Sequence, residues 1–136
     1  MKTCSTESAS LEVSDTEYIR LSTVERYSDG SGYSCFLDVC AGEFRCEGHR
    51  FDFDNLLHFL ERLQTIYESL SGEAELRHRN DEEYLQFAMD RRGHVSVNGL
   101  VTDYRECRLT FRLEADQTYL FGFLSSLYRI YDELHA

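Results

Sequence analysis

The sequence predicts an α+β fold in which a mostly antiparallel sheet of about seven strands carries two amphipathic helices on one face. Three observations support this prediction. Two segments have apolar residues at the spacing of a helix, several shorter segments alternate between apolar and polar residues, and the links between those shorter segments are too short for parallel crossovers. The expected order of elements is β-β-β-α-β-β-β-β-α.

Composition indicates one folded domain. The chain has 136 residues, of which 42% are hydrophobic, which is enough to bury a core. Residues 1–15 are rich in Ser, Thr and Glu and are expected to form a loosely ordered tail, so the α+β domain is expected to span residues 16–136. No apolar run reaches the roughly 18 residues that span a bilayer, and the first ten residues lack the apolar centre of a signal peptide. We therefore expect a cytoplasmic protein with no membrane contact.

The net charge of −11 limits the ligands that the chain can bind. An acidic protein repels the phosphate backbone, so nucleic acid is not expected as a direct ligand. The same charge would speed the encounter with a basic protein.

The first three strands are expected near residues 18–26 and within residues 33–53. If Ala41 and Gly42 form the two-residue loop of a hairpin, Asp38 lies opposite Arg45. In that register Cys40 points away from Cys35 and Cys46, because successive side chains of a strand lie on opposite faces. The odd number of cysteines, five, also favours free thiols in a reducing compartment.

The stretch DVCAGEFRCEGH nevertheless has the composition of a metal site. A structural zinc site needs four convergent ligands, and cysteines on opposite faces of a hairpin do not converge. A second metal arrangement can be drawn around His49, Asp52, Asp54 and His58, but Asp52 or Asp54 is better explained as the N-cap of the next helix. We expect no metal ion and no other cofactor.

Two helices are expected, one from about residue 54 to residue 70 and one that begins after Asp116. A shift of 64 residues superimposes their apolar positions, for example Leu63 on Leu127. Two alternatives explain the match. The chain contains two duplicated halves, or two helices that pack on one sheet have converged on the same stripe.

Four more strands are expected between the helices, and no catalytic motif lies among them. Their alternating segments are 74–79, 84–91, 95–101 and 107–113. The chain has no nucleophile elbow, no phosphate-binding glycine loop and no HExxH or CxxC motif, so we expect no catalytic residue. The open face of the sheet is a mixed polar surface that either binds a partner or is only solvated. Its candidate partner-binding residues are Asp38, Arg45, Asp90, Arg108 and Arg112.

Three segments resemble the WapI-type immunity proteins of bacterial polymorphic toxin systems. They are FDFDNLLHFLERLQTIYESLSGEAEL (51–76), DRRGHVSVNGL (90–100) and LTFRLEADQTYLFGFLSSL (109–127). The resemblance spans the chain from about Gly32 to the C-terminus, and the N-terminal third lacks the tryptophans expected near the first strands. It implies an α+β fold and direct stoichiometric binding of a cognate toxin domain, without catalysis.

Two functions therefore remain open. The first is neutralisation of a toxin protein, whose surface is expected to be basic because this chain is acidic. The second is a small ligand-binding or regulatory module that uses a groove at the sheet edge or between the helices. A homodimer also remains open.

Overall fold

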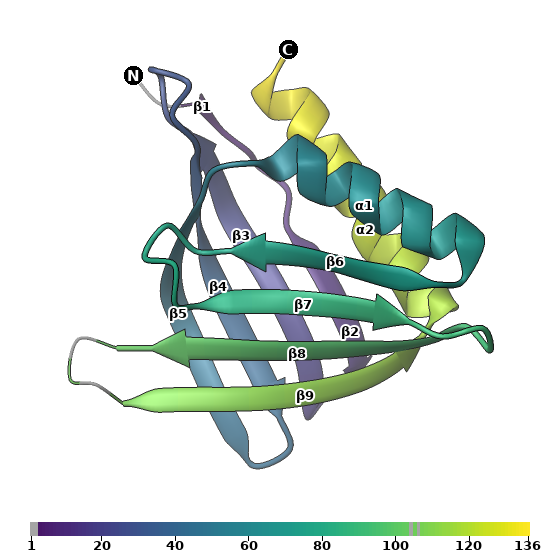
Figure 1. The fold of residues 1–136 in the computed structure, drawn as a ribbon. Helices are drawn as coiled ribbons and strands as arrows, with labels where there is room; N and C mark the ends of the chain where they lie inside the picture. The colour runs from purple at the N-terminus through teal and green to yellow at the C-terminus, as the bar shows by residue number, and fades with distance from the viewer. Residues whose placement is uncertain (1–2, 104, 106) are drawn as a thin grey trace.

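The computed structural model describes residues 3–103, 105 and 107–136, which contain nine strands and two helices (Figure 1). The α+β class is confirmed, and every strand pair is antiparallel. In chain order the elements are β1 (Thr3–Cys4), β2 (Ala9–Ser14), β3 (Glu17–Arg26), β4 (Tyr33–Ala41), β5 (Phe44–Phe53), α1 (Leu56–Ser69), β6 (Gly72–Arg77), β7 (Tyr84–Met89), β8 (His94–Thr102), β9 (Arg108–Asp116) and α2 (Gln117–Leu134).

The strands form two sheets rather than the single sheet expected from the sequence. In the first, β3 pairs with β1, β2 and β4, and β4 pairs with β5; in the second, β6, β7, β8 and β9 follow one another. Figure 1 shows the strands of the second sheet crossing in front of those of the first. Short links determine the pairing within each sheet, whereas α1 separates β5 from β6. In the described residues, one isolated bridge between Phe53 and His78 joins the two sheets.

The segment expected to be a loose tail contains β1 and β2, so that expectation is corrected. β2 pairs with β3 in an antiparallel register in which Ala9 lies opposite Leu21 and Leu11 opposite Ile19. Both Ala9 and Leu11 are fully buried. The alternation of ASLEVS, with apolar residues at 9, 11 and 13, is the strand signal in this segment.

The β4–β5 hairpin differs from its expected register. Ala41 pairs with Phe44, so Gly42 and Glu43 form the loop, and Gly42 has the positive φ (68°) that favours glycine. Arg45 consequently lies opposite Cys40, not Asp38. The observed register differs from the expected one by two residues, so each side chain stays on its expected face of the sheet. Cys40 therefore still points away from Cys46.

The helices begin at polar caps and bury the expected stripes. Asn55, not Asp52 or Asp54, caps α1 by accepting a hydrogen bond from the His58 amide at 3.0 Å. Asp116 caps α2 through the Thr118 amide at 2.8 Å. The buried stripes are Leu56, Phe59, Leu60, Leu63 and Ile66 of α1, and Leu120, Phe123, Leu124, Leu127, Ile130 and Leu134 of α2. Each large apolar side chain buried in this way contributes about 1.5–3 kcal/mol to stability.

Each helix packs mainly against the sheet of the other half of the chain. α1 follows β5 but packs against β6 and β7, whereas α2 follows β9 and packs chiefly against β2. The two helices also contact each other, and Figure 1 shows them side by side at one side of the molecule. Both halves are therefore four-stranded antiparallel meanders followed by a helix, β2 to α1 and β6 to α2. This repeated topology favours duplication over convergence of two helices on one sheet.

Candidate partner-binding site

The structure divides the five candidate partner-binding residues between the two sheets. Asp38 and Arg45 lie on β4 and β5, Asp90 lies directly after β7, and Arg108 and Arg112 lie on β9. Asp90 and Arg112 line one cavity, and Arg45 and Arg108 line another. Four of the five residues therefore form two pairs, one at each cavity, and Asp38 lies outside both.

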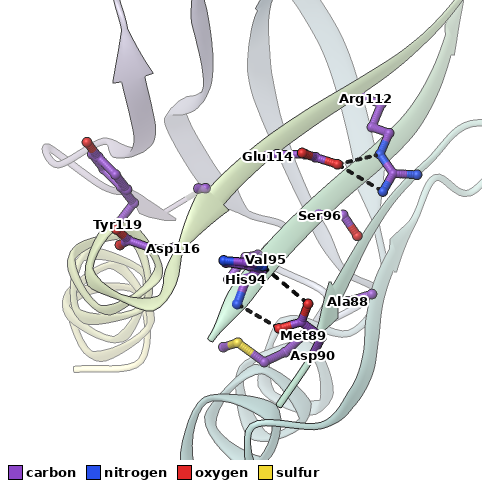
Figure 2. A pocket seen from close by; sticks show the side chains of 11 residues that line it. Ala88, Met89, Asp90, His94, Val95, Ser96, Arg112, Glu114, Asp116 and Tyr119 are labelled. Atoms are coloured by element: carbon purple, nitrogen blue, oxygen red, sulfur yellow. Dashed lines mark hydrogen bonds and ion pairs between the residues drawn. The ribbon is translucent and has the colours of Figure 1, made fainter. Parts of the chain in front are cut away.

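The first cavity has a volume of about 600 Å³ and lies where β7, β8 and β9 meet the first turn of α2 (Figure 2). The three strands bring their polar side chains to this end of the sheet, and Tyr119 of α2 adds an aromatic ring at the other side. The lining residues are Ala88, Met89, Asp90, His94, Val95, Ser96, Arg112, Glu114, Ala115, Asp116 and Tyr119.

Two pairs of ionisable side chains line this cavity. Asp90 accepts hydrogen bonds from the amides of His94 (3.0 Å) and Arg92 (2.9 Å), and its carboxylate lies 3.4 Å from His94 Nδ1. The backbone bond from His94 is the main cause of the lowered pKa of Asp90, so this carboxyl stays ionised. Arg112 contacts Glu114 through Nη2 at 3.1 Å, as Figure 2 shows. Such exposed pairs contribute little to stability and can exchange for charged groups of a partner.

The second cavity, about 260 Å³, lies between the two sheets. It is lined by Phe44, Arg45, Cys46 and His49 of β5 and by residues 101–103 and 107–109 around the β8–β9 turn. Phe44 is 65% exposed, the largest value among the exposed large apolar residues in the described part of the chain. Arg45 lies 3.7 Å from Glu47, and Arg108 forms an ion pair with Glu82.

Asp38 lines neither of these cavities. Its Oδ1 accepts a hydrogen bond from the Gly48 amide at 2.7 Å, and its Oδ2 lies 3.9 Å from Arg20. The pairing of β4 and β5 is irregular at this point, between Leu37 and Val39. Asp38 therefore supports the bulged part of the hairpin and is less available to a partner than the other four residues.

Sequence analysis missed a buried carboxylate behind the second cavity. Glu83 accepts hydrogen bonds from His49 Nε2, Asn80 Nδ2 (2.6 Å) and the Thr102 amide (3.1 Å), and its Oε2 lies 3.7 Å from His78 Nε2. The only sequence signal is the run Asp81-Glu82-Glu83, which resembles a solvated turn. Burial of its last member depends on the approach of β5 and therefore on the tertiary fold.

The second metal arrangement, which sequence analysis considered and set aside in favour of a helix cap, is not assembled around His49, Asp52, Asp54 and His58. His49 turns to Glu83, while Asp52 pairs with Arg50 at 3.4 Å and Asp54 with Arg79 at 2.6 Å. Within residues 3–103, 105 and 107–136, no group of three His, Cys, Asp or Glu side chains is placed to hold a metal ion. In the same residues, neither helix is both long and apolar enough to cross a membrane.

The described residues form an α+β domain with two surface cavities that are lined by ion-paired side chains. The profile of the Immunity protein WapI-like family matches residues 5–135, and the chain belongs to this family. No curated protein matches the chain. Membership confirms the resemblance of the three sequence segments, suggests an immunity function and implies binding to a toxin partner.

Proposed function

We propose that this protein neutralises a cognate toxin domain by direct stoichiometric binding and catalyses no reaction. The observation that carries the proposal is the family match over residues 5–135, which includes both helices and eight of the nine described strands in full. Members of this immunity family are generally non-catalytic.

The cavity beside α2 is the proposed contact surface for the toxin. Arg112 and Asp90 offer both signs of charge at one end of an uncovered sheet face. The net charge of −11 would attract a basic toxin over a Debye length of about 8 Å at physiological ionic strength. Association should therefore slow as salt is added, while specific contacts near Arg112 set the lifetime of the complex.

A small ligand is the second candidate partner. The volume of about 600 Å³ lies within the range of ligand-binding sites, roughly 300–1,000 Å³. If a metabolite is the partner, the purified protein should bind it without any toxin. Deletion of the gene for this protein should then have the same effect whether or not the toxin gene is present.

Co-expression tests the toxin proposal directly. The toxin domain encoded beside this gene should stop growth alone, and this protein should restore growth and elute with an inactivated toxin as a complex of fixed ratio from a sizing column. Failure of both rescue and co-elution would refute the proposal. The elution volume of the free protein in the same experiment reports whether it is a homodimer.

A matched pair of charge reversals locates the contact. Arg112 and Arg77 each pair with a glutamate two residues away on the second sheet, but Arg112 lies at the cavity and Arg77 on β6 at the opposite edge. Arg112→Glu, alone and with Arg108→Glu, should change the affinity while Arg77→Glu should not. Unchanged affinity for the double variant would move the contact to the helices or the N-terminal region.

A further inference from the structure

An aromatic seam runs along the exposed side of the helix pair. Phe121 is 56% exposed, yet its ring centroid lies 5.8 Å from that of Tyr67 on α1. Tyr128 follows Phe121 by two helical turns, so both rings lie on the flank of α2 that meets α1. On α1, Tyr67 contacts Phe121, and Glu61 and Glu68 lie near Tyr128. Helical spacing places Leu57 and Gln64 in the same row as Glu61 and Glu68. These five residues with Phe121 and Tyr128 are called the helix seam.

The charges of the helix seam are acidic. Burial is the main cause of the raised pKa of the Tyr128 phenol, and the nearby carboxylates of Glu61 and Glu68 raise this pKa further. Gln64 donates a hydrogen bond to Glu68 at 2.6 Å. Neither glutamate forms an ion pair with any residue that the structure describes.

Both helix arginines point away from the seam. Arg62 donates to the Glu73 carbonyl on β6 at 2.7 Å, and Arg129 donates to the Glu7 carboxylate at 2.9 Å. Each arginine therefore forms this hydrogen bond on the flank of its helix that faces a neighbouring segment. The seam is left with the exposed ring of Phe121, the half-buried rings of Tyr67 and Tyr128, and two acids, which is the combination that attracts a cationic side chain.

Gly122 lies on the exposed side of α2 next to Phe121. Apart from its chain neighbours and the backbone of its own helix, no described atom lies within 4 Å of the position that a Cβ would occupy, and the residue has no positive φ. The fold therefore does not require glycine here, although glycine is unfavourable inside a helix. Close approach of a partner to this turn of α2 would account for it.

We propose that the helix seam docks a basic segment of the toxin, whose Lys or Arg side chains lie over Phe121 and Tyr128 and pair with Glu61 and Glu68. The inference rests on the proposed function and adds the surface and the chemistry of the partner. Tyr119 lies on the opposite flank of the first turn of α2, where it lines the cavity of Figure 2. One toxin that straddles this turn therefore contacts both the seam and the cavity.

Two variants and their controls test the seam with the inactivated toxin. Phe121→Ala should weaken the affinity at least tenfold, whereas Phe36→Ala, at an exposed phenylalanine on β4, should not. Glu61→Gln with Glu68→Gln should slow association more than Glu43→Gln with Glu47→Gln. The second pair removes the same charge from the β4–β5 hairpin, at the end of the molecule away from the helices in Figure 1.

Gly122→Ala separates binding from folding. Alanine should raise the melting temperature because the position is open and helical, and it should weaken the complex if the partner approaches this turn. A complex that forms with unchanged affinity in all seam variants would overturn the seam while leaving toxin binding intact. No complex with the wild type would instead refute the proposed function.

A probe that needs no toxin tests the seam by itself. In an NMR titration with a peptide of alternating Arg and Gly at low ionic strength, the largest amide shifts should lie at Phe121, Gly122 and Tyr128. Phe121→Ala should remove those shifts although it changes no charge. Shifts spread evenly over all acidic surfaces, or unaffected by Phe121→Ala, would overturn the proposal.

Discussion

His49 on β5 donates a hydrogen bond from Nε2 to the carboxylate of Glu83, which directly precedes β7, and this contact joins the two sheets. The Glu83 side chain is only 4% exposed. Its oxygens also accept bonds from Asn80 and from the Thr102 amide, so the buried charge is satisfied from both sheets. The pair therefore helps to fix the angle at which the sheets meet.

Replacing Glu83 by glutamine should destabilise the protein by about 1–3 kcal/mol, because a neutral amide accepts these bonds more weakly and its NH2 group would face the N–H donor of Asn80 or of Thr102. Urea unfolding measures the change. Glu82→Gln is the control, since Glu82 is about half exposed and its ion-pair partner among the described residues, Arg108, is also exposed. Equal stability of the two variants would show that the buried carboxylate does not hold the sheets together.

Leu11→Ala should cost about 2–5 kcal/mol, because the side chain is fully buried on β2 and its loss leaves a cavity. Glu12→Ala, at the next and exposed position of the same strand, should change stability by less than about 0.5 kcal/mol. Thermal unfolding of both variants checks the prediction. Similar melting temperatures would indicate that β2 is not part of the folded core.

Leu63→Asp and Leu127→Asp should each unfold the domain, since either places an unpaired charge in the middle of a buried helix stripe at a cost of several kcal/mol. Thr65→Asp, at an exposed position of α1, is the control for an aspartate in the middle of this helix. Circular dichroism should show a folded control and two unfolded variants. A cooperative transition near the wild-type temperature for either leucine variant would contradict the prediction.

The thiols should react in an order set by burial. Cys4 and Cys107 are exposed and should react with a thiol reagent in the native protein, whereas buried Cys35 and Cys40 should react only on unfolding. Burial raises the pKa of Cys46, so its reaction should need a higher pH than that of a free cysteine, because only the thiolate attacks. Mass spectrometry of the labelled peptides would identify the sites. Fast labelling of Cys35 at neutral pH would contradict this order.

Local patterns were sufficient to predict the helices and most strands. The stripe that contains Leu63 extends over about three turns and the stripe that contains Leu127 over about four. The cap at Asp116 directly precedes the second helix. The division into two sheets depends on which strands pair over long distances, and α1 conceals the break between β5 and β6. The site was harder to predict for the same reason. Arg45 and Arg108 meet at one cavity only because separate sheets approach each other there.

The exchange of helices between the halves has a consequence for misfolding. β2 and β6 are the first strands of their meanders and lie at sheet edges, and each is packed by the helix that ends the other meander. Unpaired sheet edges are the places where separate molecules join into aggregates. Detachment of either helix would expose an edge in the opposite half. In the order of the chain α1 precedes β6, whereas α2 follows every strand, so a folding intermediate that contains only the β2–β5 meander lacks the helix that covers β2.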